Sequence, residues 1–340
     1  FRRVLFRSGI LDIKTNILPN ADALFLTAID SYGHELWRWT FPVNKLNQQT
    51  EQLSPLSSRP TYTETENDLT VKANKRAFIF SKKDGQLKGV SVDNRKINFA
   101  NGPRFIGARR ADRSLDQFYN HDDEKAKEKD RTYSEFPDAA VFTKLDVKED
   151  GGNLVVTANY KLGNLDKAQW TINPSGELAL DYTYNFSGVV DLMGICFDYP
   201  EDQVISKRWL GAGPYRVWQN RIHGTQYDVW ENDYNDPIPG ETFTYPEFKG
   251  YFADVSWMNI QTKEGTINLT NETPDAYIGV YQPRDGRDRL LYTLPESGIS
   301  VLNVIPPVRN KVNSTDLCGP SSQPKWVNGP QTGRVIFRFM

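Results

Sequence analysis

Hydrophobic and polar positions alternate along most of this 340-residue chain, and a period of two predicts strands rather than helices. The clearest example is 69–97, where alternating runs meet at the turn Asp84-Gly85, a strong hairpin signal. Strand-sized segments separated by Gly, Pro and Asn recur over 139–208 and again after Trp257. Such regular spacing is typical of antiparallel sandwiches and barrels, so we predict an all-β fold.

The pattern is different before this series of strands begins. Residues 9–45 contain three strand-like runs, too few for a stable sheet, and we interpret them as the last strands of a sandwich. Residues 46–65 are rich in Ser, Thr, Gln and Pro, which is the composition of a linker. We therefore predict that the main β domain covers residues 66–340.

Residues 1–8, FRRVLFRS, match the translation of a common short-read sequencing adapter, residue for residue. They contain no Met and no apolar core of a signal peptide, so we exclude them from the fold. We expect the natural chain to begin near Gly9, as the C-terminal part of a longer protein.

Aromatic residues are densest between Trp209 and Trp257, where four Trp and several Tyr and Phe alternate with Arg and amide side chains. Gly and Pro interrupt this stretch often enough to exclude a long helix. Rings interleaved with Arg216 and Arg221 suit a surface that stacks on a flat, hydroxyl-rich ligand. The alternative is a long loop whose rings form a small core of their own, and residue types alone favour that alternative.

Composition and charge exclude several classes of function. The formal net charge of −2 at pH 7 provides no basic surface, so we predict no nucleic-acid partner. No apolar run approaches the roughly 18 residues of a membrane-spanning helix, so we predict no membrane span. The segment 104–137 gathers acidic residues and His121, but it matches no metal-ligand motif, and a solvated loop is favoured over a metal site. Cys196 and Cys318 could pair, although two free, buried thiols are favoured.

Motifs for catalysis are missing from the sequence. It contains no Gly-rich phosphate loop, no His-Glu-x-x-His, no Gly-x-Ser-x-Gly and no Cys-x-x-Cys. Glycoside hydrolysis needs two carboxylates at a set separation, and the 43 acidic residues do not single out a pair. We predict no catalytic residue, no metal site and no cofactor in this chain. The catalytic machinery then either lies in a part that the chain lacks or forms an unusual all-β site.

Two stretches resemble a known family. The sequence LMGICFDYP, followed by WLGAGPYRVWQNRIHGTQYDVW, resembles the C-terminal small-chain domain of family 2 β-galactosidases. That family shows a strand R-I-G-L, which corresponds here to Met193-Gly194-Ile195. It then shows a turn W-x-G-x-G-P-x-E-N-Y-x-D-R, which corresponds to residues 209–221, and later P-Q-E-x-G, which corresponds to residues 245–250. FIFSKKDGQLKGVSVDNRKINFANGPRF resembles the opening of the same domain. The resemblance covers about residues 66–340.

This resemblance implies a galactose-mutarotase-like β-super-sandwich, preceded over 9–45 by the end of an immunoglobulin-like domain. It also implies a parent glycoside hydrolase that acts on terminal β-galactosides or related glycosides. The catalytic glutamates of such a parent, and any divalent metal, would lie in an upstream barrel. This chain alone would be inactive, with that barrel and a carbohydrate substrate as its partners. The implied location of the parent is periplasmic or secreted, and assembly into a homo-oligomer stays open.

The resemblance also indicates candidate substrate-binding residues. In the best-known members a Trp on a late loop reaches the active site and stacks on the sugar, and Trp326 is the candidate for that role here. Tyr215, Arg216, Trp218 and Arg221 are further candidates in the Gly-Pro turn. The family's Glu-Asn-Tyr is Arg216-Val217-Trp218 in this chain, and its following Asp is Asn220. A sugar other than galactose, from a plant or algal polysaccharide, therefore stays open.

A second hypothesis is a stand-alone carbohydrate-binding or aldose 1-epimerase-like protein of the same fold. Mutarotation needs a general acid and a general base, commonly Glu and His, within hydrogen-bond reach of the sugar ring. His121 and His223 could serve, but neither lies in a recognisable motif. The adapter-like start favours the first hypothesis.

Overall fold

The structure of the chain is a computed structural model, and it describes residues 10, 12–14, 21–43, 58–110, 133–234, 249–282, 294–308 and 323–340. The chain divides into two compact units, Phe1–Thr50 and Glu51–Met340. The first unit contains an antiparallel hairpin of β1 (Ala23–Ile29) and β2 (Glu35–Pro42). Two of the three runs predicted in residues 9–45 are therefore strands, whereas residues 12–14 of the first run are not.

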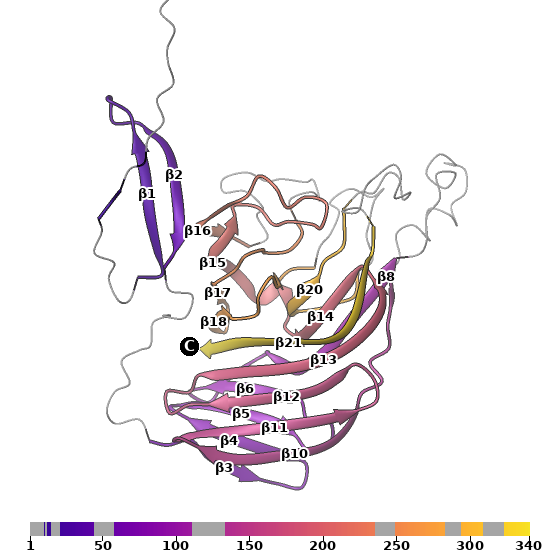
Figure 1. The fold of residues 1–340 in the computed structure, drawn as a ribbon. Helices are drawn as coiled ribbons and strands as arrows, with labels where there is room; N and C mark the ends of the chain where they lie inside the picture. The colour runs from indigo at the N-terminus through magenta and orange to yellow at the C-terminus, as the bar shows by residue number, and fades with distance from the viewer. Residues whose placement is uncertain are drawn as a thin grey trace, which may run out of the picture. The chain divides into compact units, whose positions relative to one another are not determined.

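The larger unit consists of two antiparallel sheets (Figure 1). Its described strands are β3 (Thr61–Glu64), β4 (Asp68–Ala73), β5 (Arg76–Ser81), β6 (Leu87–Val92), β7 (Arg95–Ile97), β8 (Ala100–Arg110), β9 (Tyr133–Glu135), β10 (Val141–Asp150), β11 (Asn153–Lys161), β12 (Leu165–Ile172), β13 (Leu178–Val190), β14 (Leu192–Asp198), β15 (Val204–Gly213), β16 (Gln226–Asp233), β17 (Trp257–Thr262), β18 (Gly265–Asn271), β19 (Tyr277–Gly279), β20 (Ile299–Val304) and β21 (Lys325–Phe339). One sheet has nine strands in the order β10-β11-β12-β13-β21-β18-β17-β15-β16. The other has ten, in the order β19-β20-β14-β8-β6-β5-β4-β3, with β7 beside β6 and β9 beside β8. Among the described residues the only helix is the short 3-10 turn η1, Glu201–Gln203, so the predicted all-β fold is confirmed.

One large hydrophobic core lies between the two sheets. Alternation along β12 shows how the sequence produces this core. Trp170 and Ile172 lie on one face of the strand and are buried, whereas Lys167 lies on the other face and is exposed. The ring of Trp170 from the nine-stranded sheet meets Phe80 of the ten-stranded sheet at a centroid distance of 6.0 Å. Aromatic pairs at such distances and tilted angles are favourable beyond the area that they bury. The period of two therefore places one apolar face of each sheet against the other.

A second core covers part of the ten-stranded sheet on the side away from the first. Every residue of β14 from Leu192 to Phe197 is buried, so both faces of this strand are covered. Met193 belongs to the large core, whereas Leu192 packs in a second cluster with Trp218 and Tyr251. Among the described residues of the aromatic stretch, Trp209, Trp218 and Tyr251 are therefore core residues, in line with the alternative that residue types favoured.

Gly194 in the middle of β14 is expected to be a sensitive position. A Cβ added there would collide with the carbonyl oxygen of Val301 and lie 2.7 Å from Leu302 Cα, both in the backbone of neighbouring β20. Because backbone atoms cannot move aside cheaply, Gly194→Ala should lower the free energy of unfolding by about 1–3 kcal/mol. Gly89→Ala in β6 is the matched control, since its Cβ would meet nothing within 4 Å. Chemical denaturation of both variants tests this, and an equal effect of the two would contradict it.

Candidate functional site

The turn after β15 carries four of the five predicted substrate-binding residues. It is fastened to a distant segment because Val217 and Tyr251 exchange backbone hydrogen bonds of 2.7 and 2.8 Å. The Arg221 amide then donates to the Trp218 carbonyl at 2.8 Å and closes a tight turn. Backbone pairing of this kind holds the turn in one conformation, so the places of its side chains are well defined.

Trp218 and Arg216 point into the protein. Trp218 is 1% exposed and meets Tyr251 edge to face at 5.8 Å. Arg216 is 2% exposed, and its guanidinium lies 4.9 Å from the ring centroid of Tyr281 and 5.9 Å from that of Phe252. Burial lowers the pKa of Arg216 to about 10, so the group stays charged at neutral pH. Its contacts are those of a cation held over aromatic faces.

Tyr215 and Arg221 lie nearer the surface. Tyr215 is half-buried, and its hydroxyl donates a long hydrogen bond of 3.5 Å to the carbonyl oxygen of His223. Arg221 is exposed. The structure thus divides the four residues of the turn into two buried side chains and two accessible ones, and a role in ligand binding stays a prediction for each.

Gln219 and Asn220 in the same turn hold both ends of the segment 309–322, which itself lies outside the described residues. Asn220 donates from Nδ2 to the Val308 carbonyl at 2.8 Å, and its Oδ1 accepts from the Val308 amide at 2.9 Å. The side chain of Gln219 donates from Nε2 to the Gln323 carbonyl at 2.7 Å. The backbone amide of Gln219 donates to the Pro306 carbonyl at 3.1 Å. Gln219 is buried and Asn220 is half-buried, so these bonds are partly shielded from water. We call this pair of residues the amide clamp.

Trp326, the fifth predicted residue, lies just beyond the end that the amide clamp holds. It stands near the start of β21, opposite Val189 of β13 and three positions after Gln323. Its side chain is 71% exposed. The structure therefore brings the Gly-Pro turn and the Trp326 region together, through a hydrogen bond between residues 104 positions apart.

Sequence reasoning did not identify the amide clamp. The signal was present, because two amide side chains follow the buried Trp218, and amides can donate and accept at once. Their partners, however, are backbone groups of Val308 and Gln323. Backbone groups are the same at every position, so no residue type in the sequence points to them.

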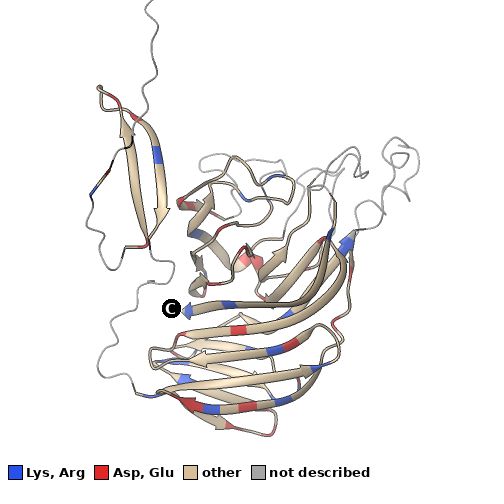
Figure 2. Cartoon of the chain, viewed as in Figure 1, with Lys and Arg blue, Asp and Glu red and all other residues tan. Residues whose placement is uncertain are grey.

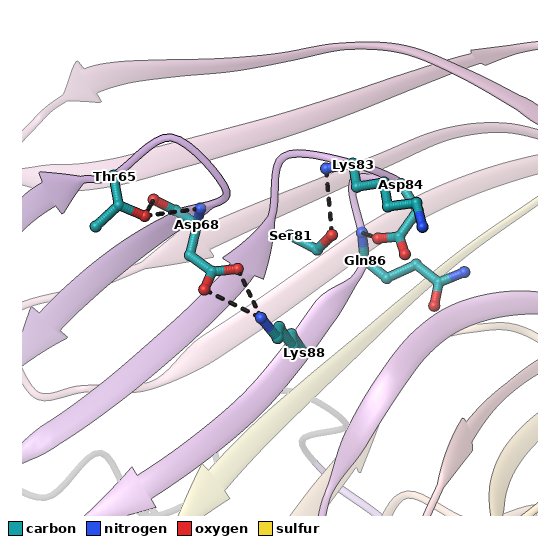
Figure 3. Close-up of polar contacts among 7 residues, drawn as sticks. All are labelled: Thr65, Asp68, Ser81, Lys83, Asp84, Gln86 and Lys88. Atoms are coloured by element: carbon teal, nitrogen blue, oxygen red, sulfur yellow. Dashed lines mark hydrogen bonds and ion pairs between the residues drawn. The ribbon is translucent and has the colours of Figure 1, made fainter.

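Two further polar pockets lie among the described residues. One, of 330 Å³, lies on the nine-stranded sheet and includes Asp181, Glu272 and Arg334. The other, of 430 Å³, lies where the β3–β4 and β5–β6 turns meet (Figure 3). There Lys88 Nζ donates to both oxygens of Asp68 at 3.0 Å, and the Gln86 amide donates to Asp84 at 3.1 Å. These contacts are typical of hairpin turns and explain the second pocket without a ligand.

The residues considered for metal binding or disulfide formation fall largely outside the described ranges. His121, Cys318 and the acidic residues of 111–132 are among them. Within the described ranges, no three His, Cys, Asp or Glu side chains lie close enough together to hold a metal ion. Cys196 is buried, and burial raises the pKa of its thiol. Among the same residues, no helix has the length and hydrophobicity of a membrane span.

A family model described as beta galactosidase small chain matches residues 72–306, which is more than half of the chain. The chain belongs to this family. The match confirms the small-chain domain that the two motifs predicted, over residues 72–306, and it includes Gly194, the turn after β15 and the amide clamp. The last described residues, from Gln323 on, follow the matched region.

The search of curated proteins found no match to this small-chain protein. Solved structures with a similar fold include a galactose 1-epimerase from Lactobacillus acidophilus NCFM, at 10% identity and a TM-score of 0.45, covering 84% of this chain and 99% of that one. Another is the GalM/aldose epimerase homologue from C. elegans, at 8% identity and a TM-score of 0.36, covering 83% of this chain and 99% of that one. Likeness at this level carries no residue roles from those proteins to this one.

Proposed function

We propose that this chain is the small-chain part of a β-galactosidase-like glycoside hydrolase that cleaves terminal β-galactosides or related glycosides. The catalytic barrel would belong to the same longer protein and lie upstream of Gly9. The family match over residues 72–306 supports the link to β-galactosidases. The described residues contribute the fixed turn after β15 and the amide clamp to this proposal.

The amide clamp is the observation that carries the proposed role. It fixes the chain immediately before and immediately after 309–322, at Val308 and Gln323, with side-chain hydrogen bonds of 2.7 to 2.9 Å. A loop presented to a neighbouring domain must have fixed ends if its residues are to contribute to catalysis, because small misplacements are costly to rate. In this proposal the exposed ring of Trp326 faces the catalytic barrel and stacks on the sugar.

The test extends the gene upstream of Gly9 and compares the extended protein with the present chain. We expect the purified chain to show no hydrolysis of 4-nitrophenyl β-galactoside, and the extended protein to hydrolyse it. Trp326→Ala in the extended protein should raise KM, because an aromatic stacking face is lost while the exposed position tolerates the change. Turnover by the present chain alone, or a start codon immediately upstream of Gly9, would contradict the proposal.

The same preparations test the second hypothesis. Polarimetry of freshly dissolved α-galactose follows interconversion of the anomers. We expect the purified chain to leave the spontaneous rate unchanged. Acceleration by the chain, lost on His223→Ala, would instead support an aldose 1-epimerase-like protein and overturn the assignment to a hydrolase.

A further inference from the structure

A polar stripe follows the outer face of the β13–β21 pair. Because Tyr182 and Tyr184 of β13 are buried in the core, the odd-numbered residues of this strand face outward. Their cross-strand partners on β21 are known from the register, in which Asp181 lies opposite Arg334 and Val189 opposite Trp326. The outward pairs are Val189 with Trp326, Ser187 with Asn328, Asn185 with Pro330, Thr183 with Thr332, and Asp181 with Arg334. We call these five pairs the outer stripe.

The outer stripe is supported from beneath. The ring of Phe186, on the opposite face of β13, packs against Phe136 at 5.3 Å and Phe105 at 6.0 Å. Val327 of β21 also packs against the large core. Figure 1 shows β13 and β21 curving together along their whole length. The side chains of the stripe therefore project from a surface whose backbone is held in place by packing.

At one end of the stripe is the pocket of 330 Å³, which Lys167 of β12 and Glu272 also line. Arg334 donates from Nη1 to Asp181 Oδ2 at 2.5 Å, and its Nε forms an ion pair with Glu272 Oε2 at 2.9 Å. Burial alone would lower the pKa of Arg334, but its contacts with Asp181 and Glu272 outweigh burial and raise it. The guanidinium is therefore fixed between two carboxylates and does not swing freely.

Polar groups in this pocket remain available to a ligand. Among the described residues, Asp181 Oδ1 and Glu272 Oε1 accept no protein hydrogen bond, and the Lys167 amine donates none. The hydroxyls of Thr183 and Thr332 lie in the same pocket. The pocket contains two cations and two carboxylates, so its charges balance, and Figure 2 shows residues of both signs along this part of the sheet. Mixed donors and acceptors without net charge suit a neutral, hydroxyl-rich molecule better than an anion or a cation.

At the other end of the stripe, Trp326 presents an exposed aromatic face. Eight residues of strand separate Trp326 from Arg334, which at about 3.3 Å per residue amounts to roughly 26 Å. A single sugar cannot reach both ends, whereas an extended chain of sugars can. Between the ends the stripe offers Ser187 and Asn328, joined by a 2.8 Å hydrogen bond, as further polar groups.

We propose that the outer stripe binds an extended chain of β-linked galactose units, with Trp326 stacking near the end that is cleaved and one remote unit held in the pocket at Arg334. The orientation of the sugar chain, with its cleaved end at Trp326, rests on the proposed hydrolase function. The inference adds that the substrate is an oligomeric or polymeric galactoside rather than a disaccharide. Binding energy at the remote pocket would hold the chain while its terminal unit reacts.

The test measures binding by the present chain, without catalysis, using isothermal titration calorimetry with galactose and with β-1,4-galactan oligosaccharides of increasing length. We expect Kd to fall with length, because contacts at Trp326 and at the pocket then act together. Arg334→Lys keeps the positive charge but removes the planar guanidinium group that contacts both carboxylates. Lys167→Met removes an exposed amine. Each should raise the Kd of the longest oligosaccharide about tenfold, which is the loss of roughly one charged hydrogen bond.

Lys148→Met is the matched control, since Lys148 is an exposed lysine on β10 of the same sheet and does not line the pocket. It should leave Kd unchanged. Failure of the unmodified chain to bind any of the oligosaccharides would overturn the inference. So would binding that is independent of length, or that Arg334→Lys and Lys167→Met leave within twofold. Since no hydrolysis is measured, this result stands apart from the activity test of the extended protein, and either can fail alone.

Discussion

If the proposed function holds, replacing Asn220 by Leu in the extended protein is expected to lower kcat/KM by about a hundredfold, the cost of misplacing a contributing group by about 1 Å. The variant removes both hydrogen bonds that join the turn to Val308. Leu has the same branched arrangement of side-chain heavy atoms as Asn, so the substitution keeps the shape of the side chain while removing its polar groups. What changes is the position of the chain as it enters 309–322.

A role in positioning makes a different prediction from a role in stability alone. Losing two side-chain hydrogen bonds should cost about 1–3 kcal/mol of unfolding free energy in either case. Asn98→Leu is the matched control, because it removes a side-chain hydrogen bond from Asn98 to the carboxylate of Glu264, and a bond to a charged group contributes about 1.5–3 kcal/mol. It should lose comparable stability and keep kcat/KM.

Steady-state kinetics on 4-nitrophenyl β-galactoside, with thermal unfolding of the same samples, separates the two roles. Gln219→Leu should behave like Asn220→Leu, because it releases the other end of the segment at Gln323. If both clamp variants keep wild-type kcat/KM while losing stability, the amide clamp is structural only. The proposal then loses its main support.

The second large effect is expected from Trp209→Ala, which should lower the free energy of unfolding by about 3–5 kcal/mol. Trp209 is 0% exposed, and it packs against Phe252 at 5.0 Å. Its Nε1 donates to the Ala212 carbonyl at 3.0 Å. Truncation would leave a large cavity in the main core and an unpaired carbonyl beside it.

Trp326→Ala is the matched control for that experiment. Trp326 is 71% exposed, so its loss should change the unfolding free energy by no more than about 0.5 kcal/mol. Urea denaturation of the purified chain gives both values. A large loss of stability from Trp326→Ala would mean that the ring is part of the fold, which contradicts its assignment as a stacking platform.

The strands themselves could be predicted because alternation is a local property. Residues 69–97 read as strand, turn at Asp84-Gly85, strand, and the structure has β4, β5 and β6 there, with β5 and β6 paired antiparallel. The family could also be predicted, since the turn from Trp209 to Arg221 keeps its Gly and Pro positions. Both predictions needed only residues close together in the sequence.

The roles within the aromatic stretch could not be divided in the same way. Trp209 and Trp218 are buried, and Trp230 and Trp257 are only half-buried. All four are Trp residues with similar neighbours in the sequence. The difference arises because β14 needs cover on its second face, and Trp218 with Tyr251 provides it. Which ring provides cover depends on where β8, β14 and β20 lie, and no local pattern reveals that.

The sequence by itself determined the strands, the turn chemistry and membership of the beta galactosidase small chain family. Only the tertiary structure decided which residues form sites. The amide clamp joins Gln219 and Asn220 to backbone groups 104 and 88 positions away, respectively, and the pocket at Arg334 combines β12, β13, β21 and the residue after β18. The physical reason is that side-chain periodicity fixes only the face on which a residue lies. Strand order and register, which set its neighbours on that face, arise from the packing of the whole sandwich.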